Sequence, residues 1–168
     1  MKVRSYKKPT AIDLYSGVGG WSLGLKMAGF RVLRSYEWWN AAVETHRGNF
    51  PHQGKQEPIN IREMSLKSSL PAPKDVAIVV GSPPCTQFSY SNRGGSGDID
   101  DGLRDIACFL DAVEYLRPKF WVMENVPRVA SVLERELEEG GSLERYRGLF
   151  GPKPVIEVVD ISEYGLPQ

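Results

Sequence analysis

Apolar runs typical of strands alternate along this chain with segments of helical periodicity, and this alternation constrains the fold more than any other feature. Strands are expected at residues 10–14, 31–36, 75–80, 120–123 and 154–161, with a weaker signal near 58–61. Helices are expected at residues 21–28, 40–49, 106–116 and 128–139. Strands that alternate with helices indicate parallel strands joined by helical crossovers. We therefore predict an α/β fold with a doubly wound, mainly parallel sheet.

The run Asp75–Val80 gives the strongest strand signal, because it is continuous and β-branched, as a buried parallel strand should be. The clearest helix has apolar residues at i, i+3, i+4, i+7 and i+10 from Ile106, and Pro118 is expected to end it. Ser91–Asp101, between them, is a polar, glycine-containing stretch. Its composition suits a plain connector and a mobile lid equally well.

The composition restricts the setting of the protein. The 168 residues suit one domain, and no apolar run approaches the ~20 residues that span a bilayer. The first residues contain no apolar run, so no secretory signal is predicted. Cys85 and Cys108 do not indicate a disulfide framework, so we expect a reducing, cytoplasmic setting. His46 and His52 have no further ligands at suitable spacing, so no metal site is predicted. The 21 basic and 21 acidic side chains cancel, whereas a self-sufficient nucleic-acid binder usually carries a basic surplus.

A glycine-rich segment, Asp13–Gly20, follows the first predicted strand and precedes the first helix. Glycines there permit a tight turn and let a ligand approach the backbone N–H groups at the start of the helix. A plain strand–helix turn is an equally good interpretation of this segment alone. Its spacing is G-x-G-G rather than G-x-G-x-x-G, so it does not specifically indicate a nicotinamide or flavin cofactor.

Glu37 ends the second predicted strand and is followed by Trp38 and Trp39. In doubly wound folds an acidic residue at this point accepts hydrogen bonds from ribose hydroxyls, and an adjacent aromatic ring can stack on adenine. The alternative is a surface glutamate beside tryptophans of the core. Together with the glycine-rich segment, the pattern favours a nucleoside site.

Cys85 follows the strongest strand and a pair of prolines, which stiffen its backbone. Active sites of such sheets lie at the carboxyl ends of the strands, so this thiol is a candidate nucleophile rather than a merely buried cysteine. Cys108, on the amphipathic helix, is expected to be inert packing. Glu124 ends the neighbouring strand, and its segment Met123–Pro127 is either a carboxylate site close to Cys85 or a strand-terminating turn.

Four segments, in this order and at these gaps, resemble motifs of the cytosine-5 DNA methyltransferase family: DLYSGVGGWSLGL, EWW, GSPPCTQFS and MENVP. PPC and ENV together are highly specific for that family, and Asp160–Gln168 is similar to the opening of its eighth motif. The resemblance covers most of the chain. It implies a Rossmann-like, S-adenosylmethionine-dependent methyltransferase fold over residues 1–168, left incomplete by the absence of a target-recognition domain and of the last family motifs.

The resemblance also implies a reaction. Cys85 would attack carbon 6 of a cytosine that is flipped out of the duplex. Glu124 would hydrogen-bond ring nitrogen 3 of that base, and Asn125 would help to hold the loop. Carbon 5 would then take the methyl group of S-adenosylmethionine, and a base would remove the carbon 5 proton to release the enzyme.

The same resemblance assigns contacts to cofactor and substrate. Glu37 would bind the ribose and Trp38 would stack on adenine. Ile61 would cover the other side of the adenine, and Asn60, where the family often has Asp, would bond its amino group. The full cofactor set is Tyr15, Ser16, Gly17, Val18, Gly19, Gly20, Glu37, Trp38, Asn60, Ile61 and Pro84, the last as a wall of the pocket. The stretch Ser91–Asp101 matches the mobile loop of the family, with Ser89, Ser91, Asn92 and Arg93 as the substrate-loop candidates.

Three functions are compatible with these patterns. In the first, the chain is the cofactor-and-nucleophile part of a DNA cytosine methyltransferase, and a missing part or a second polypeptide holds the DNA. In the second, it is a module that binds S-adenosylmethionine or a partner chain and does no chemistry alone. In the third, the substrate is transfer RNA, on which one branch of the family acts. A zero net charge is consistent with the first function, in which other sequence supplies the DNA-binding part of the enzyme.

Overall fold

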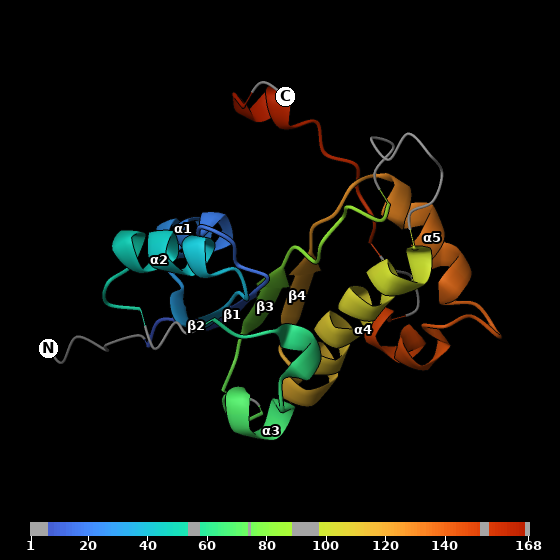
Figure 1. Cartoon of the computed structure of the whole chain (residues 1–168), viewed down its shortest axis with the longest axis horizontal. Helices are drawn as coiled ribbons and strands as arrows, with labels where there is room; N and C mark the ends of the chain where they lie inside the picture. The colour runs from blue at the N-terminus through green and yellow to red at the C-terminus, as the bar shows by residue number, and fades with distance from the viewer. Residues whose placement is uncertain (1–6, 54–57, 74, 89–97, 152–154, 167–168) are drawn as a thin grey trace, which may run out of the picture. The chain divides into compact units, whose positions relative to one another are not determined.

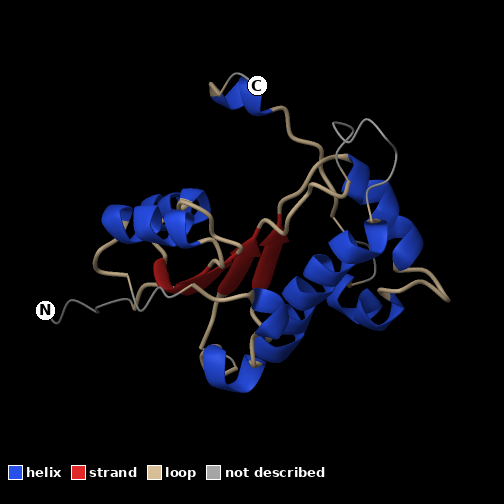
Figure 2. Ribbon diagram, viewed as in Figure 1, coloured by secondary structure: helices blue, strands red, loops and turns tan. Residues whose placement is uncertain are grey.

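The computed structural model describes residues 7–53, 58–73, 75–88, 98–151 and 155–166. The chain divides into two compact units, residues 1–125 and 126–168. The first unit holds a four-stranded parallel sheet in the order β2-β1-β3-β4 (Figures 1 and 2). Its strands are β1 (Thr10–Leu14), β2 (Arg31–Tyr36), β3 (Ile78–Gly81) and β4 (Phe120–Met123). The predicted α/β fold with a mainly parallel sheet is confirmed.

The four strands end together at one edge of the sheet, here called the carboxyl edge. Leu14 pairs with Tyr36 of β2 on one side and with Gly81 of β3 on the other. Gly81 in turn pairs with Met123 of β4. A side chain is excluded at Gly81, because a Cβ there would lie 2.5 Å from the carbonyl oxygen of Leu14. The segments that follow the four strands therefore leave the sheet side by side.

Helices lie on both sides of this sheet. In Figure 1, α1 (Gly20–Met27) and α2 (Asn40–Asn49) lie on one side and α4 (Ile99–Leu116) on the other. The predicted apolar stripe of α4 is buried, and Ile106 and Phe109 are fully enclosed. α4 begins earlier than its apolar periodicity predicts, because the Asp98 side chain caps its first turn. A shorter helix, α3 (Leu66–Ser69), precedes β3.

The regular structure described in the second unit consists of helices only. It contains α5 (Arg128–Glu136) and two 3-10 helices, Glu144–Phe150 and Ile161–Tyr164. α5 buries Val132 and Leu133 on one face, as the apolar spacing of that segment requires. Among the helices that the structure describes, none is both long and apolar enough to cross a membrane.

Two predicted strands are wrong. The run near 58–61 makes only a single parallel bridge, between Glu37 and Pro58, and then turns into a 3-10 helix, Ile61–Glu63, whose first turn Asn60 caps. In the run 154–161, the described residues from 155 to 160 have no regular structure. Val155 is 95% exposed. A β-branched sequence becomes a strand only where a partner strand takes its backbone hydrogen bonds.

Candidate functional site

The turn after β1 has the sharp, left-handed backbone that the glycine-rich segment suggests. Gly17 and Gly19 have φ values of 50° and 103°, and the non-glycine Tyr15 also has a positive φ of 55°. A Cβ at Gly19 would lie 2.5 Å from the ring of Phe50, so only glycine fits there. The Ser16 N–H donates to the Tyr36 carbonyl at 3.0 Å, which ties the turn to β2. α1 then begins at Gly20.

Glu37 holds this turn and its own strand end together. Its Oε2 accepts a hydrogen bond from the Gly17 N–H at 3.0 Å. Its Oε1 accepts from the N–H groups of Trp38, at 2.9 Å, and Trp39, at 2.8 Å. The two tryptophans are 65% and 60% exposed, so the alternative that they belong to the core is wrong. Trp38 presents an open aromatic surface beside a carboxylate that is already fixed in place.

The segment that follows α2 reaches the same strand end. The Ile59 N–H donates to the Glu37 carbonyl at 2.8 Å. The Asn60 side chain accepts from the Arg62 N–H at 3.1 Å and donates to Glu63 at 2.8 Å. Ile61 is only 6% exposed. The structure therefore places Asn60 and Ile61 near Glu37, where both side chains already have structural roles.

The Cys85 and Glu124 segments are joined by hydrogen bonds at the ends of β3 and β4. The Glu124 N–H donates to the Gly81 carbonyl at 3.0 Å. The Asn125 amide donates to the Pro83 carbonyl, also at 3.0 Å. Cys85 is half-buried, and its carbonyl accepts from the N–H of the fully buried Phe88. These bonds place the candidate thiol and the candidate carboxylate on neighbouring segments.

Other candidates lie beside these segments or outside the described residues. Pro84 and Glu124 are exposed, as are Val18 and Gly20 of the turn. The substrate-loop candidates Ser89, Ser91, Asn92 and Arg93 all lie outside the described residues. Cys108 is half-buried on α4, and burial raises the pKa of its thiol, which keeps it protonated and unreactive.

Asp13, near the end of β1 where the glycine-rich segment begins, has a buried carboxyl to which the sequence analysis gave no role. It is 0% exposed, and burial raises its pKa to about 7 although the Ser22 hydroxyl donates to its Oδ2 at 2.7 Å. Its Oδ1, the Ser16 hydroxyl and Nε2 of His46 are buried without a hydrogen-bond partner among the described residues. Burial also lowers the pKa of His46, so burial favours the neutral forms of both Asp13 and His46.

A second unpredicted group joins the site to α4. Arg62 donates to the carboxylates of Asp101 and Asp105, and the Tyr15 hydroxyl also donates to Asp105. Arg62 lowers the pKa of Asp101. One sequence signal for this group is the spacing of Asp101 and Asp105 by one helical turn, on a helix whose core face is otherwise apolar.

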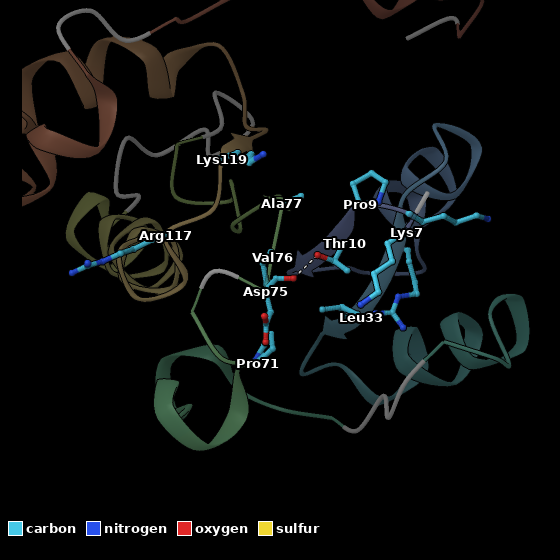
Figure 3. A pocket seen from close by; sticks show the side chains of 12 residues that line it. Lys7, Pro9, Thr10, Leu33, Pro71, Asp75, Val76, Ala77, Arg117 and Lys119 are labelled. Carbon is cyan, nitrogen blue, oxygen red and sulfur yellow. Dashed lines mark hydrogen bonds between the residues drawn. The ribbon is translucent and has the colours of Figure 1, made fainter. Parts of the chain in front are cut away.

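A hollow of about 640 Å³ lies at the opposite, amino edge of the sheet, where the strands begin (Figure 3). Its polar lining is mainly basic: Lys7, Lys8, Arg31, Arg117 and Lys119, with Asp75. Because it lies at the starts of the strands, it is separate from the candidate residues at the carboxyl edge. Within the described ranges, no group of three or more His, Cys, Asp or Glu residues could hold a metal ion.

Comparison with known proteins adds to this geometry. The family model of C-5 cytosine-specific DNA methylases matches residues 10–168. The type II methyltransferase M1.HphI of Haemophilus parahaemolyticus is 36% identical over 166 residues, which are 95% of this chain and 43% of that protein. M.HindV of Haemophilus influenzae is 38% identical over 122 residues, 70% of this chain and 38% of that protein. The chain thus spans about two fifths of the length of these two relatives.

A solved structure has the same fold. It is a prophage-encoded protein of E. coli assigned as a DNA modification methyltransferase, with a TM-score of 0.58 and 28% sequence identity. The match covers 84% of this chain and 36% of that one.

Proposed function

Since the chain belongs to the C-5 cytosine-specific DNA methylase family, a family of enzymes, we propose that it transfers methyl groups from S-adenosylmethionine to carbon 5 of cytosine in DNA. One observation carries this proposal: the order of groups along the carboxyl edge. Following the strand order β2-β1-β3-β4, the edge presents Glu37, the glycine-rich turn, Cys85 and Glu124. Ligands of open α/β sheets bind at this edge, so a nucleoside part and a chemical part lie next to each other.

The first half of the edge suits S-adenosylmethionine, which supplies an electrophilic methyl group when bound. Both Glu37 oxygens accept backbone N–H bonds, yet a carboxylate has about four acceptor sites, so it can still accept from ribose hydroxyls. The exposed ring of Trp38 offers a surface on which adenine can stack. The Ser16 hydroxyl, in the neighbouring glycine-rich turn, is buried without a hydrogen-bond partner among the described residues. These residues fit a nucleoside better than they fit a metal or a dinucleotide.

The second half of the edge suits addition to a pyrimidine. Cys85, as the thiolate, would form a bond to carbon 6 of a flipped-out cytosine, which pushes electron density toward carbon 5 and ring nitrogen 3. A proton held between the Glu124 carboxyl and nitrogen 3 would form the hydrogen bond that neutralises that charge. Carbon 5 takes up the methyl group, a base removes the carbon 5 proton, and the sulfur–carbon bond breaks to release Cys85. Asn125 acts as a brace, because its amide holds the Pro83 carbonyl.

DNA binding requires more than these residues provide. The chain has 21 basic and 21 acidic side chains, whereas a self-sufficient nucleic-acid binder usually carries a net basic surplus. We therefore propose that further sequence, in the same polypeptide or in a second one, supplies most of the contacts that bind DNA. We also propose that the reaction takes place in the cytoplasm of a prokaryotic cell or of a phage-infected host.

The test is transfer of a tritiated methyl group from S-adenosylmethionine to cytosine-containing DNA. The chain is assayed alone and with a polypeptide that supplies the remaining length of the family. We expect incorporation with the added polypeptide and little without it. DNA with 5-fluorocytosine should trap a covalent adduct, because the fluorine on carbon 5 cannot leave as a proton does. Binding of S-adenosylmethionine without methyl transfer in either assay would instead support a binding module.

A further inference from the structure

Arg62 makes four hydrogen bonds to one face of α4. Its Nε and Nη2 form a fork on the two carboxylate oxygens of Asp105, at 2.9 and 2.7 Å. Its Nη1 donates to the carboxylate of Asp101 at 2.6 Å, and Nη2 also donates to the Asp101 carbonyl at 3.0 Å. Because Asp105 is only 6% exposed, this is a directed anchor and not a solvated surface pair.

Tyr15 is bound to the same carboxylate. The single proton of its hydroxyl is shared between the Asp105 carbonyl, at 3.0 Å, and Oδ1, at 3.2 Å. Tyr15 is also the residue of the glycine-rich turn that has a positive φ without being glycine. A strained backbone persists only where its surroundings hold it, and here the holding contact comes from Asp105.

α4 also contacts the segment of the candidate nucleophile. The Asp98 N–H, at the start of the helix, donates to the Gln87 side chain at 3.0 Å. A Cβ at Gly102 would lie 2.6 Å from the ring of Phe88, so the helix packs directly against this segment. The first two turns of α4 thus touch the glycine-rich turn, the Ile61–Glu63 turn and the Cys85 segment.

We propose that Arg62 and Asp105 are positioning residues for the adenosyl side of the site. Together they hold Tyr15 and the Ile61–Glu63 turn in the geometry that binds the nucleoside. This inference rests on the proposed function, because it names what the network positions. Lysine at residue 62 would keep the charge but lose the planar fork, and Asp105 would then be buried with fewer of its bonds satisfied.

The experiment is calorimetric titration of the 168-residue chain with S-adenosylmethionine and with S-adenosylhomocysteine. Arg62→Lys should weaken both about tenfold, the size expected for a lost hydrogen bond to a charged group. Both ligands should lose affinity equally, because they share the adenosyl part. The matched control is Arg31→Lys, an exposed arginine at the amino edge, which should leave both affinities unchanged.

A double-mutant cycle separates positioning from general loss of stability. Tyr15→Phe removes only the hydroxyl, and its effect on affinity should not add to that of Arg62→Lys, because both act through Asp105. If Arg62→Lys does not fold, as judged by circular dichroism, Asp101→Asn replaces it and should weaken binding about threefold, as for a half-exposed charged contact.

The outcomes distinguish this inference from the proposed function. Wild-type binding with an unchanged affinity in folded Arg62→Lys, or in folded Asp101→Asn where that variant replaces it, overturns the positioning role and leaves the proposed function standing. Additive effects in the cycle also overturn it. A wild-type chain that binds neither ligand, alone or with the added polypeptide, counts against the proposed function itself.

Discussion

The two edges of the parallel sheet differ in how their polar side chains are held. At the carboxyl edge, Glu37, Asn125 and Asp13 each make hydrogen bonds to named neighbours on other segments. At the amino edge, five basic side chains surround a hollow, and none of them makes an ion pair or side-chain hydrogen bond to another described residue. The two edges therefore differ in how firmly hydrogen bonds fix their side chains, and not only in charge. Groups fixed before a ligand arrives are suited to orient it, whereas long, unpaired side chains mainly provide solvation.

The largest effect is expected for the nucleophile. Cys85→Ser should lower methyl transfer by at least about a thousandfold, because a serine hydroxyl is a far weaker nucleophile than a thiolate. The assay is tritium incorporation by the chain together with its complementing polypeptide. Cys108→Ser is the control, and it should retain activity. Turnover in the Cys85→Ser protein would remove the chemical half of the carboxyl edge from the mechanism.

Asp13 should give the next largest effect, through pH. Its pKa of about 7 in the folded chain lies above the ordinary value of 3.8, so the folded state holds a proton that the unfolded state loses. Protonated Asp13 therefore contributes fully to the free energy of unfolding at low pH. As the pH rises from about 4 to about 7, the free energy of unfolding falls by on the order of 4 kcal/mol.

Asp13→Asn isolates that contribution. Urea unfolding at pH 5 and pH 8 should show a steeper loss of stability in the wild type than in the variant, which has no carboxyl to ionise. Parallel pH profiles for the two proteins would show that Asp13 is solvated or paired, contrary to its burial.

Glu37 should have a smaller effect, on ligand affinity. Glu37→Ala leaves three backbone N–H groups without their acceptor and removes the side-chain link between the turn and the end of β2. We expect S-adenosylmethionine to bind about thirtyfold more weakly, since a hydrogen bond to a charged group is worth ~1.5–3 kcal/mol. Calorimetry measures this, with Glu37→Gln as the milder variant that keeps one oxygen. An affinity that does not change in Glu37→Ala would refute the ribose role.

The smallest effect is expected at the amino edge. Lys119→Gln should change the free energy of unfolding by less than about 0.5 kcal/mol, because the side chain is exposed and makes no ion pair with another described residue. Cofactor affinity should also stay unchanged. A large change in either measurement would mean that the side chains of the basic hollow are fixed as firmly as those of the carboxyl edge. The comparison between the edges would then fail.

Local patterns were enough to predict most of the regular structure. The apolar runs of β1, β2 and β4 and the helix α2 form where the sequence places them, because their patterning and their end residues agree. The run 154–161 fails because strand formation depends on a partner that its own sequence does not reveal. The run near 58–61 fails because Asn60 caps a turn.

The site was predictable in its residue types but not in its connections. The strand ends and the motifs pointed to Glu37, Cys85 and Glu124. Nothing local indicated that Arg62 would reach Asp105, since the two are 43 positions apart. The exposure of Trp38 was also open, because a tryptophan after a strand suits core and surface equally. Long-range hydrogen bonds and burial are properties of the assembled sheet.

The strand order has a consequence for how the chain is divided. The nucleoside half of the edge comes from one continuous stretch, β1 through the Ile61–Glu63 turn, and the chemical half comes from another, β3 through Asn125. The β1–β3 ladder of four residue pairs is the seam between them. Two side-chain hydrogen bonds also connect the two stretches across that seam. They join Arg62 to Asp105 and Trp21 to Ser82, the second with a length of 2.9 Å. Substitutions within one stretch thus leave the other stretch intact, whereas a substitution at a residue that bonds across the seam requires a matching change in its partner.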